Sequence, residues 1–74
     1  MYASKMKRFV LRRHEDVSGN SGTGIVAEGC EYSSGMVAIT WLSALPVYAW
    51  YHSMRVIETL HGHDGRTVVE WIDS

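Results

Sequence analysis

The chain has 74 residues, of which 46% are hydrophobic and 20% are charged, and its formal net charge is -1 at pH 7. This length leaves room for one small domain and excludes a second. A domain of this size buries only roughly 60% of the surface of its unfolded chain, so we expect an additional stabiliser. Because Cys30 is the single cysteine, a disulfide within the chain is excluded. Association into a homo-oligomer is therefore the favoured stabiliser.

Basic residues gather at the start of the chain, in the segment from Lys5 to Arg13. We expect residues 1–7 to form a flexible basic N-terminal arm and residues 8–74 to form a single small β-barrel domain. A basic arm can follow the phosphates of nucleic acid. The favoured interpretation is a first strand at the edge of the sheet, where charge deters pairing with other chains. Nucleic acid is thus a considered partner but not the favoured one.

The start of the chain lacks the apolar run of a secretory signal, because Phe9-Val10-Leu11 leads directly into Arg12. The single thiol suits a reducing compartment, and we expect a cytoplasmic protein. Residues 32–54 contain no Asp, Glu, Lys or Arg and are long enough to cross a bilayer. Polar residues and Pro46 interrupt this segment, so we expect no membrane association.

Alternating apolar residues and turn residues predict five strands. Phe9 and Leu11 share one face of the first strand, and strict alternation in the second strand places Ile25 with Ala27. A Ser33-Ser34-Gly35 turn joins the second and third strands into a hairpin. The expected strands are residues 8–13, 24–32, 36–42, 47–51 and 66–72.

One short helix is expected between the last two strands, over residues 54–61. Ser53 can cap its start and Gly62 can end it. Its apolar stripe is expected to consist of Val56, Ile57 and Leu60. The order of elements predicts a mainly β protein, a small five-stranded and partly open barrel of the SH3-like kind with one short helix before the last strand.

A glycine-rich segment between the first two strands is a candidate anion site. Successive backbone N–H groups in such a turn form a concave nest, and hydroxyl groups add donors. The segment is not a P-loop, because no Gly-Lys-Ser/Thr triplet follows it. A plain connection between strands explains it as well. The candidate ligand-binding residues here are Ser18, Gly19, Ser21, Gly22, Thr23 and Gly24.

A cluster of His61, His63 and Asp64 is a candidate metal site. Two imidazoles and a carboxylate can fill three positions around zinc and leave the fourth to water. The spacing matches no established zinc motif, and histidines near the end of a helix followed by an Asp-initiated turn explain the cluster too. Zinc is the one cofactor considered. The sequence selects no catalytic residue, and Cys30 in the middle of a strand is expected to be an apolar filler.

Aromatic residues are the stronger indication of function. In the fourth strand Tyr48 and Trp50 alternate with Tyr51, so both faces carry large rings. One face is expected to join the core. The other presents rings to solvent, a ligand or another subunit, unless the helix covers both faces. We expect Tyr48 and Trp50 to line a ligand pocket with the glycine-rich segment and with His61, His63 and Arg66.

Four pieces of the chain resemble a group of short uncharacterised proteins of bacteria, archaea and their phages. The pieces are Glu15-Asp16-Val17-Ser18-Gly19, Ser21-Gly22-Thr23-Gly24, Val26-Ala27-Glu28-Gly29 and His61-Gly62-His63-Asp64-Gly65. The resemblance covers about residues 8–73. It implies a small phage-borne accessory protein and supplies no activity for these residues.

These observations predict a non-enzymatic small binding module that forms a homo-oligomer. Its expected partner is an anionic, nucleotide-like small molecule or a protein of the host. In a phage such a module would sequester a signal or cover a host protein. The alternative from another class is a small metal-assisted hydrolase that uses His61, His63 and Asp64 around a metal-bound water.

Overall fold

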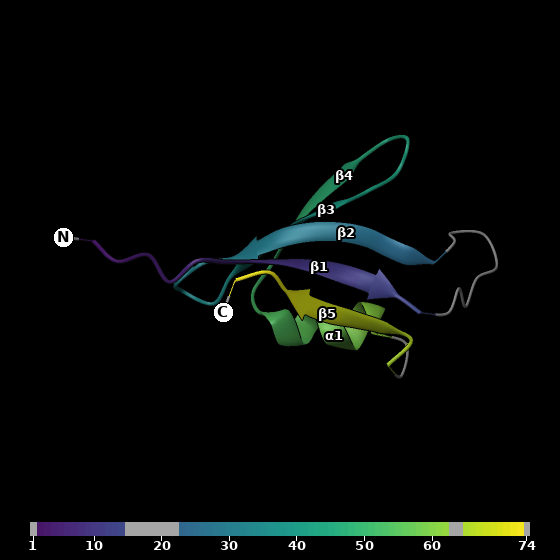
Figure 1. Cartoon of the computed structure of the whole chain (residues 1–74). Coiled ribbons are helices and arrows are strands. Elements are labelled where there is room, and N and C mark those ends of the chain that lie inside the picture. Colours follow the sequence, from purple (N-terminus) through teal and green to yellow (C-terminus); the bar gives the residue numbers. More distant parts are fainter. Residues whose placement is uncertain (1, 15–22, 63–64, 74) are drawn as a thin grey trace.

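The computed structural model describes residues 2–14, 23–62 and 65–73 (Figure 1). These residues form five strands and one helix, at positions close to those expected from the sequence. The elements are β1 (Lys7–Arg13), β2 (Gly24–Glu31), β3 (Val37–Trp41), β4 (Val47–Tyr51), α1 (Met54–His61) and β5 (Thr67–Trp71). The prediction of a mainly β protein with one short helix before the last strand is confirmed.

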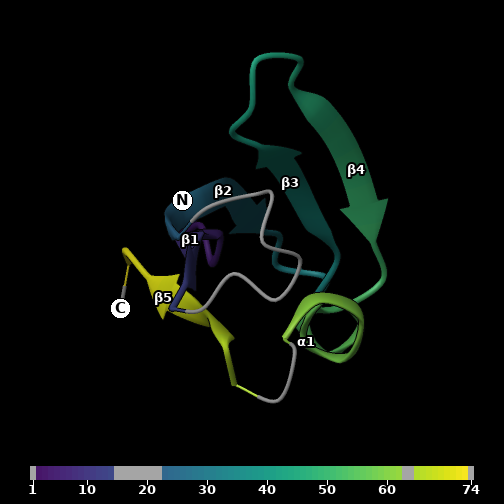
Figure 2. The ribbon, with the colours of Figure 1, turned by 90° about the vertical axis from the view of Figure 1, so that its right-hand side faces the viewer.

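The strands form one antiparallel sheet in the order β4-β3-β2-β1-β5. Strands β4 and β5 are its two edges and do not pair with each other, so the sheet is not closed into a barrel. Figure 2 shows the sheet curling from β5 round to β4, with α1 on the inner side of the curve. We call the side that faces α1 the inner face and the opposite side the outer face.

The expectation that the first strand lies at an edge is wrong. Strand β1 pairs with β2 on one side and with β5 on the other, and is therefore interior. Its basic side chains serve contacts with the C-terminal part of the chain. Arg8 Nη2 lies 2.9 Å from an oxygen of Asp73, and Arg12 Nε lies 2.6 Å from an oxygen of Glu70. The charges thus bind β1 to β5 and its continuation.

The core lies between the inner face and α1. Phe9 and Leu11 are fully buried there, as the alternation in the first strand predicts. Antiparallel partners point to the same side of a sheet, so Leu11 stands beside Ala27 of β2. The core side chains are Phe9, Leu11, Ala27, Val37, Ile39 and Ile57.

A β-bulge changes the alternation in β2. The register shifts between Leu11 and Arg12, so that Leu11 pairs with Ala27 but Arg12 pairs with Ile25. Val26 is the additional residue, and it packs against the core while Ile25 is exposed. The expectation that Ile25 shares a face with Ala27 is therefore wrong, because a bulge shifts the period of two by one residue.

Helix α1 turns a different stripe to the core from the one expected. Met54 and Ile57 contact the core, but Leu60 is 57% exposed. Ser53 occupies the N-cap position without a side-chain capping hydrogen bond. Gly62 ends the helix in a right-handed conformation with φ -69°, so it is not the left-handed cap that glycine often provides.

Glycine is required elsewhere, at the two turns that carry a positive φ beside well-placed hydrogen bonds. Gly35 has φ +93° in the β2–β3 turn, where its N–H donates to the oxygen of Tyr32 over 2.9 Å. Gly65 has φ +88° and donates to the oxygen of Gly62 over 3.1 Å just before β5. Side chains other than hydrogen rarely tolerate such angles.

The membrane alternative depends on the uncharged segment 32–54. That segment contains β3, β4 and the turn between them. Across the described residues no helix is long and apolar enough to cross a membrane.

Candidate functional site

The outer face of the sheet carries two rows of side chains, each running across four strands. The pairing of the strands fixes both rows, because directly opposed residues point to the same side. One row consists of Arg8, Cys30, Ala38 and Trp50, and the other consists of Val10, Glu28, Thr40 and Tyr48. In the first row large side chains stand at both ends and small ones in the middle. This order of sizes hollows the face.

The hollow is a groove with a volume of about 490 Å³. We call it the outer-face groove. It falls within the range of about 300 to 1,000 Å³ that small-molecule sites occupy. The residues that shape it are Arg8, Glu28, Cys30, Ala38, Tyr48 and Trp50. Its lining is mostly apolar, with a cation and a carboxylate added by Arg8 and Glu28.

Two aromatic rings of β4 form one side of the groove. The residues Tyr48 and Trp50 are 76% and 63% exposed, so β4 is not covered on both faces. The ring of Tyr32 stacks on Trp50 with centroids 5.7 Å apart and planes inclined by 20°. This stacking holds the indole in place. A planar ligand can therefore stack against β4 without first ordering the tryptophan.

Arg8 supplies a positioned positive charge at the opposite side of the groove. Asp73 accepts hydrogen bonds from the Arg8 Nε at 3.0 Å, from its Nη2 at 2.9 Å and from its backbone N–H at 2.8 Å. The side-chain hydrogen bond with Arg8 lowers the pKa of Asp73 to about 2 and raises the pKa of Arg8. The pair therefore stays ionised at neutral pH. Nη1 of the guanidinium carries two further N–H donors.

A second group of predicted residues lies at the end of the sheet where β1 finishes. Arg13 pairs with Gly24 on one side and with Thr67 on the other. The His14 N–H donates to the Arg66 oxygen over 2.6 Å. The described ends of the glycine-rich segment and of the histidine segment are thus brought side by side. Ser18, Gly19, Ser21, Gly22, His63 and Asp64 lie outside the described residues.

His61 belongs to this end of the sheet, on its inner face. Its ring packs edge-on against Trp41, with centroids 4.8 Å apart, and its Nε2 lies 3.3 Å from the hydroxyl oxygen of Tyr51. These contacts fix the orientation of the imidazole. Within the described residues no group of three His, Cys, Asp or Glu side chains could hold a metal ion.

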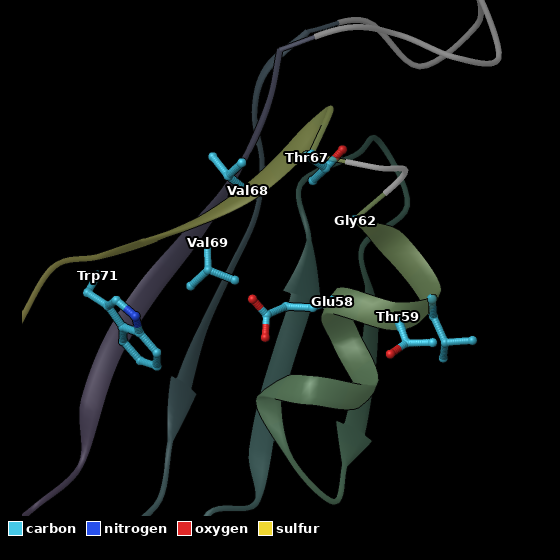
Figure 3. A pocket seen from close by; sticks show the side chains of 9 residues that line it. Glu58, Thr59, Gly62, Thr67, Val68, Val69 and Trp71 are labelled. Carbon is cyan, nitrogen blue, oxygen red and sulfur yellow. The ribbon is translucent and has the colours of Figure 1, made fainter.

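A second cavity opens between α1 and β5, with a volume of about 620 Å³ (Figure 3). The carboxylate of Glu58 points from the helix toward the strand, facing Val69. Leu60 and Trp71 also line the cavity. The charged side chain in this lining is the Glu58 carboxylate, whereas the outer-face groove has Arg8 in addition to its carboxylate Glu28. Among its described lining residues the cavity therefore offers an anion no cationic partner.

The structure thus divides the predicted ligand-binding residues between two places. Tyr48 and Trp50 lie in the outer-face groove, whereas Gly24, His61 and Arg66 lie at the end of the sheet. The exposed Thr23 comes just before Gly24 and belongs with the second group.

Sequence reasoning missed Arg8, Glu28 and Ala38 as groove residues. The available signal was the register of the β2–β3 hairpin and of β3 with β4. Aligning the strands places the small Ala38 between Cys30 and Trp50. Arg8 joins that row only through the pairing of β1 with β2.

Fold and groove together define a small, mainly β protein with an aromatic, open-sided groove on the outer face of one antiparallel sheet. The chain belongs to a phage protein family, described as Acb5 phage protein, which matches residues 6–73. No curated protein and no solved structure matches the chain.

Proposed function

We propose that this phage protein is a non-enzymatic accessory module that binds a nucleotide-like anion in the outer-face groove and works as a homo-oligomer. In a phage, such a protein would act by sequestering a nucleotide signal of the infected cell. The observation that carries the proposal is the pair of exposed rings, Tyr48 and Trp50, that face a fixed guanidinium across an apolar hollow.

The base and the phosphate of a nucleotide each have a matching group in the groove. A base can stack on Trp50 or Tyr48, and such stacking contributes about 1–3 kcal/mol per base. The Glu28 carboxylate accepts hydrogen bonds from base N–H groups. The Nη1 donors of Arg8 suit a phosphate oxygen, because hydrogen bonds between ionised partners are the stronger ones. Phosphates and rings therefore have separate places.

Native mass spectrometry of protein purified from its producing cell tests this proposal. We expect a metal-free oligomer that carries an additional mass of nucleotide size, and we expect Trp50→Leu to lose that mass. Leu60→Ala serves as a control, because Leu60 is 57% exposed, lies on α1 and does not line the groove. Retention of the mass by Trp50→Leu, or an additional mass that proves to be a host protein, would contradict the proposal.

Metal-assisted hydrolysis by His61, His63 and Asp64 remains the alternative. The orientation of His61 by Tyr51 favours it, since groups that hold an imidazole in place are typical of metal sites. The native mass spectra described above also distinguish the hydrolase from the binding module. A monomer that carries equimolar zinc, lost in His63→Ala, would favour the hydrolase.

A further inference from the structure

Strand β4 is an edge strand of the sheet that contains no charged side chain. It pairs with β3 on one side, and no strand of the described residues pairs with its other side. Its five residues, Val47 to Tyr51, include no charged side chain, and none occurs anywhere between residues 32 and 54. Natural edge strands are normally protected by charge, proline or a covering element, because bare edges pair with other chains. Figure 2 shows no element beyond the outer edge of β4.

The surface around this edge is strongly apolar. Val47 is 58% exposed, Tyr48 76% and Trp50 63%. Leu45, in the turn that precedes β4, is 83% exposed. Only six hydrophobic side chains are buried among the described residues, and one of them is the small Ala27. A chain with so small a core and so large an exposed apolar edge gains stability by covering that edge.

We infer that β4 pairs antiparallel with β4 of a second copy, about a twofold axis through Ala49, to join two sheets into one. A second copy of the chain is a partner that is always available to the β4 edge. The absence of charged residues in β4 also suits pairing between two identical strands. A twofold axis places each residue of the strand opposite a residue of the same strand, and the absence of charge in β4 excludes like-charge repulsion there.

This axis pairs all five residues of the strand. Val47 lies opposite Tyr51 of the second copy, Tyr48 lies opposite Trp50 of the second copy, and Ala49 lies opposite itself. Because the axis is perpendicular to the sheet, outer-face side chains meet outer-face side chains. The rings of both outer-face grooves then stand together at the centre of a ten-stranded sheet, so each copy completes the aromatic side of the other's groove.

The inference rests on the homo-oligomer in the proposed function and gives it an interface. A cross-linking experiment tests the register. In a Cys30→Ser background, Ala49→Cys places two thiols on the axis, where antiparallel partners have Cα atoms about 4.5 to 5.5 Å apart. That separation suits a disulfide. An added oxidant takes two hydrogens from the thiols, and we expect a covalent dimer.

Leu60→Cys in the same background is the matched control, since Leu60 is 57% exposed and lies on α1. We expect it to cross-link at least about tenfold more slowly. Equal rates for the two cysteines would overturn the inference. So would a wild-type chain that is monomeric in native mass spectrometry at concentrations where the proposed ligand binds.

A charge at the edge provides an independent test. Val47→Lys introduces one charge per copy into the apolar contact, and we expect the dimer dissociation constant to rise about 100-fold. Leu60→Lys changes a residue of equal exposure and should leave the constant unchanged. Val47 does not line the groove, so loss of the dimer and loss of nucleotide binding are measured separately. An undiminished dimer in Val47→Lys would overturn the inference even if nucleotide binding holds.

Discussion

The two edges of the sheet differ in their charge, which is one of the features that protects an edge strand. At the β5 edge, Glu70 and Asp73 form ion pairs with arginines of β1, and the neighbouring core residues are buried. At the β4 edge there is no charge, and aromatic and aliphatic side chains are exposed. The β5 half thus has ion pairs beside its edge, whereas the β4 half presents an uncharged surface suited to a ligand or a second copy. Because the β5 edge of the same sheet carries charged side chains, the lack of charge at the β4 edge is specific to β4.

The largest expected effect on stability concerns two leucines, one in each half of the sheet. Leu11 is 1% exposed in β1, whereas Leu45 is 83% exposed beside β4. We expect Leu11→Ala to lower the free energy of unfolding by about 2–5 kcal/mol, the usual result of emptying a core position. Leu45→Ala should change it by less than about 0.5 kcal/mol in the dissociated chain. Urea unfolding at low protein concentration measures both values, and similar losses would contradict the assignment of the two halves.

The next test concerns Gly29 in β2, where the two halves join. A Cβ added there would lie 2.7 Å from Phe9 Cζ and closer still to the Ala38 oxygen. We expect Gly29→Ala to destabilise the protein by about 1–3 kcal/mol, because the backbone of β3 must shift. Gly24→Ala is the control, since it adds backbone strain at φ +93° but meets no atom within 4 Å. Thermal unfolding should rank Gly29→Ala as the more damaging change.

The ion pairs of the β5 edge predict a smaller, pH-dependent effect. The pKa of Asp73 is about 2 when folded and near its ordinary value of 3.8 when unfolded. A lowered folded pKa means that the contribution is fully present above about pH 4 and is lost as the pH falls toward 2. We expect Asp73→Asn to reduce the loss of thermal stability over this interval. An NMR titration that places the Asp73 pKa near 4 would contradict the pairing with Arg8.

The smallest effect is expected at Ser53, which connects β4 to α1. Because its side chain makes no capping hydrogen bond, Ser53→Ala should cost only a few tenths of a kcal/mol, below the usual loss of about 1 kcal/mol for an N-cap serine. A loss of 1 kcal/mol or more by chemical denaturation would show that the hydroxyl does cap the helix in solution.

Most of the fold could be predicted from the sequence, because local patterns determine it. The alternation of Phe9 and Leu11 and the turn at Gly35 place their strands correctly. The neighbours of β1 could not be predicted, since its partner β5 lies about sixty residues away and nothing local specifies the pairing. The helix was ambiguous for a similar reason. Ile57 belongs to two possible apolar stripes, and contact with the sheet selects the one with Met54.

The candidate site could be predicted only in part. The rings of Tyr48 and Trp50 were found because alternation in an uncharged strand leaves one face without an obvious cover. Arg8 could not be predicted as a groove residue, because its place in the same row as Trp50 depends on the register of three strand pairs. The prediction that His61 shares a pocket with Tyr48 and Trp50 required all three side chains to lie on the same face of the sheet. The curl of the sheet instead places His61 on the inner face.

The central claim is that the β4 rings bind a nucleotide, and isothermal titration calorimetry with the four ribonucleoside monophosphates tests it most directly. Tyr48 and Tyr2 are matched, with exposures of 76% and 77%, but only Tyr48 lies in the groove. We predict saturable binding by the wild-type protein, weakened about tenfold by Tyr48→Leu and unchanged by Tyr2→Leu. The absence of binding to all four nucleotides up to about 1 mM, or equal losses in the two variants, would contradict the claim.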